Sequence, residues 1–459
     1  MEHKSQAKII SCNFDNTAIC AGAARISTTE GDSDQVFEKS KNNPNNEKLI
    51  KKVLKSGHRS TVEHAVFTLS MRNVSVYVEQ FFIEFRLASF TVKSRRYVDF
   101  ARQGYYIPDG LPEAEQDLYC GYMDMLFGAY QKLLLNDIPK EDARFLLPYS
   151  FNSNFYCTLN ARELINLIRA AKYGRGKEIP ELNALADQIV EQLKEVFPCI
   201  LDEITPPPAG SGERTEECGV FHTADLSEEP IFRTEDEAGG VEMLNSPAAP
   251  MKLLEVACKL SGSLSDSPLD MRELILSQRP RELEQLGYTF LISDVTLSGI
   301  THLVRHRMQS IIVPPIQTAD LGCYIMPRSI SNSVKAREIY TDAVVKAHKA
   351  VISLQKNVTL KKYIYYFALS GNLMNVMTTV NARELLLFIR LRTCNRAQWE
   401  VKNAAVRMLK ELREHFPELF DRYGPSCYVC GVCPEGDKSC GKMKEVRERF
   451  SERGTKALI

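Results

Sequence analysis

Residues 160–164 read Asn-Ala-Arg-Glu-Leu, and residues 381–385 repeat the same five amino acids. Each copy begins two positions after a threonine, Thr158 or Thr379. The offset of 221 residues also pairs other positions: Glu63 with Glu284, Phe67-Thr68 with Tyr288-Thr289, Val74 with Val295, Arg86 with Arg307, and Ser89 with Ser310. Chance does not hold one register over so long a stretch, so the chain contains an internal duplication.

A period of this length indicates two duplicated domains, because the repeats of a solenoid span only roughly 20 to 50 residues. The 459 residues are 44% hydrophobic and 25% charged, which suits a globular protein with two cores. We place the first copy at 1–205 and the second at 251–425. Residues 206–250 are rich in Pro, Gly, Ser and Glu, as linkers are, and residues 426–459 form a cysteine-rich tail.

Each copy contains a segment in which β-branched and aromatic residues partly alternate with polar ones, at 64–78 and at 287–300. This pattern is typical of a strand that leads into a helix. Apolar residues at helical spacing follow each Asn-Ala-Arg motif, and the second such segment is predicted to be one helix from Asn381 to about Phe416. The predicted fold class is α+β, a mixed or antiparallel sheet with long helices, present twice.

The charge of the chain favours small-molecule substrates. Lysine and arginine together balance aspartate and glutamate at a net charge of zero, so we expect neither nucleic acid nor a membrane as partner. The N-terminus lacks the apolar stretch of a signal peptide, and no apolar run approaches the roughly 18 residues of a membrane span. Nine cysteines are scattered singly between Cys12 and Cys394, as reduced thiols usually are. We therefore expect a cytoplasmic protein.

The residues with most chemical promise are Arg305-His306-Arg307, followed by Ser310. Two guanidinium groups beside an imidazole repel one another unless an anion such as a phosphate or a reduced flavin lies nearby. The alternative is a surface triplet paired with carboxylates. Likewise, each Asn-Ala-Arg-Glu-Leu motif could be no more than a helix start with asparagine as its cap.

The order of these features resembles the flavin-dependent thymidylate synthases in both copies. The family signature is Arg-His-Arg, two residues, Ser, one residue, Asn, two residues, Ser, one residue and Arg. Neither copy has this signature intact. The first copy reads Glu84-Phe85-Arg86, Ser89, Thr91, Ser94 and Arg96, whereas the second reads Arg305-His306-Arg307, Ser310, Ile312, Pro315 and Gln317.

The same division is found downstream, where the family has one arginine before a Leu-Pro turn and another after a leucine on a helix. The first copy keeps Arg144 but has Ala171 at the second position. The second copy has Tyr365 at the first position but keeps Arg392. Because the losses are complementary, the resemblance implies one kind of site assembled from both copies.

The resemblance also implies a role for each retained residue. The residues expected to bind deoxyuridine monophosphate (dUMP) are Ser94, Arg96, Arg144, Arg305 and Arg392. Arg392 is the expected catalytic residue, because a cation beside the uracil ring stabilises negative charge that develops there. The residues expected to bind FAD are Arg305, His306, Arg307, Asn160, Arg162, Asn166, Ser60 and Glu63.

The implied activity is methylation of dUMP to thymidine monophosphate, with methylenetetrahydrofolate as carbon donor and NADPH as reductant through FAD. Since the family forms homotetramers, two duplicated chains are expected to pair as a homodimer. The alternative is a non-catalytic relative that binds flavin or nucleotide as a sensor or partner subunit, which the departures at Ile312, Pro315 and Gln317 would explain.

Four cysteines in the tail, Cys427, Cys430, Cys433 and Cys440, are close enough in sequence to hold a structural zinc ion. The resemblance extends to this tail, which some members of the family share, and suggests an accessory role there. The alternative is an exposed, reduced tail. A nucleic-acid module is disfavoured by the zero net charge and the lack of interleaved aromatic residues.

Overall fold

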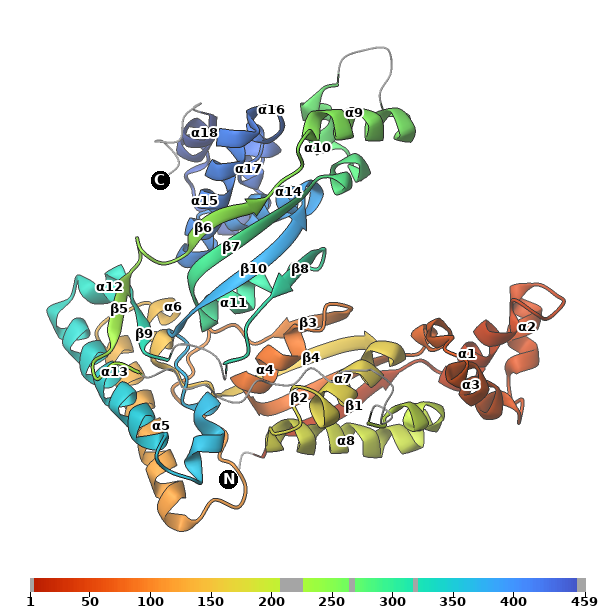
Figure 1. Ribbon diagram of the computed structural model, residues 1–459, viewed down its shortest axis with the longest axis horizontal. Coiled ribbons are helices and arrows are strands. Elements are labelled where there is room, and N and C mark those ends of the chain that lie inside the picture. The colour runs from red at the N-terminus through yellow and green to blue at the C-terminus, as the bar shows by residue number, and fades with distance from the viewer. Residues whose placement is uncertain (1–3, 207–225, 264–268, 317–320, 452–459) are drawn as a thin grey trace. The chain divides into compact units, whose positions relative to one another are not determined.

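The protein was examined as a computed structural model, which describes residues 4–206, 226–263, 269–316 and 321–451. The chain forms two compact units: unit 1 contains Met1–Ala224 and Ile339–Leu369, and unit 2 contains Asp225–Glu338 and Ser370–Ile459. Each unit has a four-stranded antiparallel sheet with helices packed against it (Figure 1). The predicted α+β class, present twice, is confirmed.

The sheet of unit 1 has the strand order β1-β2-β4-β3. Its strands are β1 (Gln6–Cys12), β2 (Val66–Ser75), β4 (Asn152–Asn160) and β3 (Ala88–Val92). Along β2, every second side chain is buried in the core, at Phe67, Leu69 and Met71. This period of two is the pattern of a strand with one face buried, as the sequence predicted.

Helices of unit 1 pack around its sheet, and α1, α2 and α3 gather beyond one end of the strands (Figure 1). They are α1 (Asn16–Arg25), α2 (Ser33–Ser40), α3 (Asn46–Lys55), η1 (Arg59–His64), α4 (Val76–Ile83), α5 (Glu113–Leu134), α6 (Lys140–Ala143), η2 (Arg144–Leu146), α7 (Ala161–Tyr173), α8 (Pro180–Val196), η3 (Pro198–Glu203), most of α13 (Val334–Leu354) and η6 (Leu360–Tyr366). The amides of Ala7 and Ile9 each donate to a glutamine of α8 at 2.8 Å, so α8 lies along β1.

The sheet of unit 2 repeats this order as β6-β7-β10-β8. Its strands are β6 (Gly240–Asn245), β7 (Gly287–Thr296), β10 (Leu373–Asn381) and β8 (Gln309–Ile312), and β5 (Ile231–Thr234) and β9 (Cys323–Met326) form a separate parallel pair. The helices are α9 (Pro250–Ser261), α10 (Met271–Leu276), η4 (Arg281–Gln285), α11 (Leu297–Leu303), α12 (Arg328–Ser331), α14 (Ala382–Arg392), α15 (Trp399–His415), α16 (Pro417–Phe420), α17 (Ser426–Val429), η7 (Gly436–Lys438) and α18 (Met443–Ser451).

The duplication is visible in single hydrogen bonds. The hydroxyl groups of Thr68 and Thr158 lie 3.0 Å apart, and those of Thr289 and Thr379 lie 3.0 Å apart. The edge strands share an irregularity as well, since the pairing of β1 shifts after Ile9 and that of β6 shifts after Met243. The two copies therefore agree in register and not only in topology.

Two expectations from the sequence differ from the structure. The segment 206–250, expected to be a linker, contains β5 and β6 in its described part, and β6 is an edge strand of the second sheet. The single helix expected from Asn381 to Phe416 is two helices, α14 and α15, because the amide of Ala397 turns back to the carbonyl of Cys394 and Gln398 is extended. Apolar residues at helical spacing lie on both sides of this turn, so the sequence pattern alone does not predict the break.

Part of the second copy belongs to unit 1. Within that unit the rings of Tyr77 and Tyr365 lie 4.6 Å apart, and the hydroxyl of Tyr122 donates to the carbonyl of Phe367 at 3.0 Å. Pro148 forms an antiparallel bridge with Leu369, its own counterpart at the repeat offset. Residues 339–369 are therefore a structural part of unit 1.

A buried carboxylate fixes the end of β2 in unit 1. Glu181 of α8 is 1% exposed and accepts hydrogen bonds from the Ser5 hydroxyl at 2.7 Å, the Ser75 amide at 2.8 Å and the Tyr366 hydroxyl at 2.8 Å. Ser75 is also the N-cap of α4. Burial raises the pKa of Glu181, and the hydrogen bonds from Ser5, Ser75 and Tyr366 oppose this rise.

We predict that Glu181→Ala lowers the free energy of unfolding by about 2 kcal/mol near pH 5, because the Ser75 amide and the Tyr366 hydroxyl lose a buried acceptor. The folded-state pKa is raised, so the stabilisation should be largest below the unfolded pKa of roughly 4.3 and should shrink as the pH rises through the folded pKa. Urea unfolding across this pH range would measure it. Glu178→Ala, at an exposed site, is the control, and an equal loss in both variants would contradict the prediction.

Candidate functional site

The Arg-His-Arg triplet lies in unit 2, in the loop between α11 and β8. His306 is buried, and its Nδ1 lies 2.9 Å from Oε1 of Glu384. Arg392 Nε donates to His306 Nε2 at 3.0 Å. Because a guanidinium group can only donate, Nε2 carries no proton and Nδ1–H donates to the carboxylate. The imidazole is therefore held neutral in one tautomer.

Arg392 is anchored at the last turn of α14. A second nitrogen, Nη2, donates to the carbonyl of His302 at 3.1 Å, and the ring of Phe388 packs edge-on against His306 with centroids 4.9 Å apart. Arg305 and Arg307 flank His306 in the chain and are exposed. The structure thus brings the triplet and the helix arginine together as one basic surface.

Arg96 and Arg144 meet at Glu141 in unit 1. Nε of Arg96 lies 2.7 Å from a carboxylate oxygen of Glu141, and Nε of the buried Arg144 donates to the Glu141 carbonyl at 3.1 Å. The Ser94 hydroxyl accepts the amide of Arg96 at 3.3 Å. The three dUMP-binding residues expected from the first copy therefore converge within one unit, and the carboxylate of Glu141 lies where Arg96 could bind an anion.

The predicted flavin residues of the first copy lie on η1 and on α7, which pack against each other. Arg162 Nη1 lies 2.6 Å from Glu63 Oε1, and Ser60 is exposed on η1. Asn160 accepts the amide of Glu163 at 2.9 Å as the N-cap of α7. The helix-cap interpretation of this asparagine is confirmed, and its role toward flavin stays a prediction.

Asn166 lies one turn further along α7 and is exposed. Its Nδ2 donates to Oε2 of Glu163 at 3.3 Å. Glu163 therefore contacts both asparagines, Asn160 through its amide and Asn166 through its carboxylate. In the second copy Asn381 caps α14 in the same way and Arg383 pairs with Glu284, but Leu387 replaces the second asparagine.

The positions that each copy has lost are filled by packed side chains. In the first copy Phe85 stands where the second has His306, and the guanidinium of Arg175 lies 4.6 Å from the Phe81 ring and 5.7 Å from the Phe85 ring. Ala171 is buried at the position of Arg392. In the second copy Tyr365 is buried at the position of Arg144, and burial raises its pKa far above the usual range.

Sequence reasoning missed two carboxylates that position the arginines, Glu141 and Glu384. Glu384 follows its cap Asn381 by three residues, the spacing of a capping box, which marks it as a residue with a structural role. Glu141 precedes Arg144 by three residues, the spacing of neighbours on a helix. Both signals are short range, and neither shows that the carboxylate contacts an arginine or histidine distant in sequence.

The tail cysteines lie on α17 and around η7 and are half-buried. Burial and the neighbouring thiols of Cys394, Cys433 and Cys440 raise the pKa of Cys427. Over the described ranges, no group of three or more His, Cys, Asp or Glu side chains is arranged to hold a metal ion. The expected zinc site at Cys427, Cys430, Cys433 and Cys440 is therefore not supported.

Among the helices that the structure describes, none has both the length and the apolar character needed to cross a membrane.

We predict that Arg392→Ala removes the donor that keeps His306 Nε2 unprotonated, so the ring should gain a proton at Nε2 while Glu384 still accepts from Nδ1. Nitrogen-15 NMR of histidine-labelled protein at pH 7 would measure this, with His306→Asn identifying the signal. Arg422→Ala, at an exposed site, is the control. An unchanged Nε2 resonance in Arg392→Ala would contradict the observed contact.

Comparison with known proteins identifies the family. Residues 8–199 and 255–418 match the family described as Thymidylate synthase complementing protein. A flavin-dependent thymidylate synthase from Clostridium tetani is 31% identical over 223 residues, which cover 44% of this chain and 87% of that protein. The UPF0159 protein Ta1429 from Thermoplasma acidophilum is 25% identical over 341 residues, covering 68% of this chain and 63% of that protein.

A solved structure, the UMP/dUMP methylase PolB from Streptomyces cacaoi bound with 5-Br dUMP, has a TM-score of 0.37 and 23% identity, covering 44% of this chain and 94% of that one. The two family matches include most of both repeats and leave the segment between them and the tail outside. The chain belongs to the Thymidylate synthase complementing protein family and carries the family domain twice.

Proposed function

We propose that the protein methylates dUMP to thymidine monophosphate, with methylenetetrahydrofolate as carbon donor and NADPH as reductant through FAD. Family membership and the flavin-dependent thymidylate synthases among its relatives support this. The observation that carries the proposal is the complementary retention of arginines: Arg96 and Arg144 converge in unit 1, while Arg392 is fixed against His306 in unit 2.

The side chains suit the parts of a nucleotide. Arg96 and Arg144 offer planar guanidinium groups that bind a phosphate through paired, charge-assisted hydrogen bonds, and Ser94 adds a hydroxyl donor. Arg392, with Arg305 beside the same surface, would lie against the uracil ring and stabilise negative charge developing there. Glu384 acts through His306, because it fixes the tautomer that accepts from Arg392.

The residues predicted for the flavin fit an anionic, donor-seeking group. Arg305 and Arg307 are exposed cations beside a neutral imidazole, and Ser60, Asn166 and Arg162 present exposed donors on unit 1. When bound, FAD supplies the redox chemistry of the reaction. The protein residues would hold its phosphates and offset its charge, with Asn160 and Glu63 completing the surface on α7 and η1.

The proposal requires groups from both copies in one site and places two chains in a homodimer. Four copies would then supply two sites with a full set of arginines and two positions without one. In the two incomplete positions, Tyr365 of the second copy replaces the arginine at Arg144. Phe85 and Ala171 of the first copy replace His306 and Arg392.

A second candidate is a non-catalytic relative that binds flavin or nucleotide as a sensor or partner subunit. It is favoured by the stack of Arg175 on Phe81 and Phe85, which closes the triplet position of the first copy. Leu387 in place of the family asparagine also favours the non-catalytic candidate. This candidate predicts binding without turnover.

We predict flavin absorbance in the purified protein and release of tritium from 5-labelled dUMP when methylenetetrahydrofolate and NADPH are supplied anaerobically. Arg392→Ala should lower the turnover number on the order of 100-fold, and Arg96→Ala should lower kcat/KM for dUMP by a similar factor. Arg422→Ala is the control. Flavin and dUMP binding without tritium release would favour the non-catalytic candidate.

We further predict one dUMP per chain by isothermal titration, because only half of the potential sites have a complete set of arginines. Introducing Ala171→Arg should not raise this number, since Ala171 is buried and the first copy has Phe85 in place of the triplet histidine. Two nucleotides per wild-type chain would refute the composite arrangement.

A further inference from the structure

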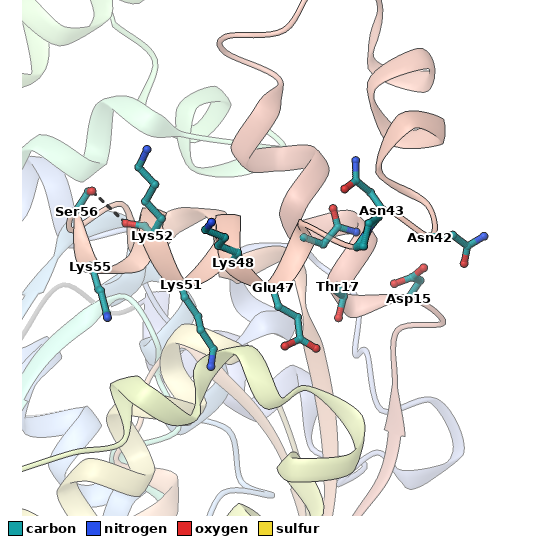
Figure 2. Close-up of a pocket in the computed structure, with 12 residues that line it drawn as sticks. Asp15, Thr17, Asn42, Asn43, Glu47, Lys48, Lys51, Lys52, Lys55 and Ser56 are labelled. Carbon is teal, nitrogen blue, oxygen red and sulfur yellow. Dashed lines mark hydrogen bonds between the residues drawn. The ribbon is translucent and has the colours of Figure 1, made fainter.

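The helix α3 of unit 1 lines an open groove of about 1000 Å³ (Figure 2). Four of its lining residues are Lys48, Lys51, Lys52 and Lys55. Their spacing of three, four and seven residues places them on one stripe of the helix, while Ile50 and Leu54 are buried on the other side. We call this feature the lysine groove.

The lysine groove carries more positive than negative charge. Lys51 pairs with Asp202 at 3.2 Å, whereas Lys48, Lys52 and Lys55 have no ion-pair partner among the residues that the structure describes. Two acids also line the groove. The Asp15 carboxylate caps α1, accepting the Ala18 amide at 2.8 Å, and with Glu47 and the Asp202 partner of Lys51 it leaves the four lysines one positive charge in excess. An anionic ligand would restore the balance.

The second copy lacks this feature. At the repeat offset, Lys48, Lys52 and Lys55 correspond to Leu269, Glu273 and Leu276. The registers of the two helices agree, since buried Ile50 corresponds to buried Met271 and buried Leu54 to buried Ile275. The lysine stripe is therefore a property of the first copy and not of the fold.

The helix that carries the lysines leads in the chain to the predicted flavin residues of the same copy. The amide of Gly57, at φ 85°, bonds to the Leu54 carbonyl at 2.8 Å and ends α3 in a tight turn. This turn passes directly into η1, which packs on α3 and carries Ser60 and Glu63. A ligand held at Ser60 and Glu63 would have the lysine stripe beside it.

We propose that the lysine groove binds the glutamyl carboxylates of the folate co-substrate, with a preference for chains of several γ-linked glutamates. This inference rests on the proposed function. A folate ends in glutamate, and each added residue contributes one carboxylate at regular spacing. The stripe from Lys48 to Lys55 extends over roughly 10 Å of helix, long enough to meet more than one carboxylate. Ammonium groups on flexible stems suit such a chain better than a rigid fork would.

The test compares methylenetetrahydrofolate carrying one glutamate with the form carrying five, by isothermal titration. The pentaglutamate should bind wild-type protein about tenfold more tightly, because several exposed ion pairs each contribute little and their sum falls as salt rises. The triple variant Lys48→Ala, Lys52→Ala, Lys55→Ala should lose this advantage and keep its affinity for the monoglutamate. The matched control is Lys252→Ala, Lys259→Ala, Lys349→Ala, three exposed lysines elsewhere.

Equal affinity of wild-type protein for the two folates would overturn the proposal. Inorganic tripolyphosphate tests the other source of anionic charge: lysine-dependent binding of tripolyphosphate without any pentaglutamate advantage would make the groove a phosphate site and also overturn it. If the monoglutamate does not bind, the free penta-γ-glutamate peptide tests the groove separately from the proposed function. Lysine-dependent binding of this peptide would support the groove while the proposed function fails, and its absence would refute both.

Discussion

A buried carboxylate at the start of α15 holds the part of unit 2 that carries the Arg-His-Arg triplet in place. Glu400 accepts from the amide of Thr296 and, at 2.6 Å, from its hydroxyl, while Gln398 donates to the same carboxylate at 3.1 Å. Thr296 caps α11, and the triplet loop begins where α11 ends. A Cβ on Gly299 would lie 2.6 Å from Glu400 Oε2, so only glycine allows this approach. One carboxyl group thus ties the start of α15 to the start of α11, the helix that ends at the triplet loop.

Glu181 is the matching carboxylate of unit 1, and its neighbourhood shows how far duplication preserved the scaffold. Both copies retain a carboxylate against the residue that caps the helix after the central strand, Ser75 or Thr296. Their surfaces have diverged instead. Buried carboxyl groups of this kind are costly to remove because their donors would be left without partners, whereas the arginine positions have been refilled by apolar or aromatic side chains such as Ala171 and Tyr365.

The sequence predicted those features that depend on short-range pattern. The strands β2 and β7 follow from alternation, and the caps Asn160 and Asn381 follow from the motif itself. The break between α14 and α15 did not follow, because apolar spacing continues from Leu391 to Trp399 while the backbone turns. The edge strand β6 is short and has no buried residue, and it lies in a segment rich in Pro, Gly, Ser and Glu, so the composition around it is that of a linker.

The sequence proposes the candidate site as a set of residues and not as a set of contacts. Complementary losses identified Arg96, Arg144 and Arg392, but the partners Glu141 and Glu384 depend on how the chain folds back on itself. In the tail, closely spaced cysteines suggest a metal, but spacing alone does not place four thiols around one point, and the described residues show no such group.

The contribution of residues 339–369 to unit 1 makes the fusion difficult to reverse. A fragment that ends before residue 225 would lack Tyr365, Tyr366 and Phe367, and would expose the aromatic surface formed by Tyr77, Tyr106 and Tyr122. Exposed surfaces of that kind promote aggregation. Each repeat has become dependent on the covalent presence of the other, so the ancestral single domain cannot be recovered by cutting the chain at the repeat boundary.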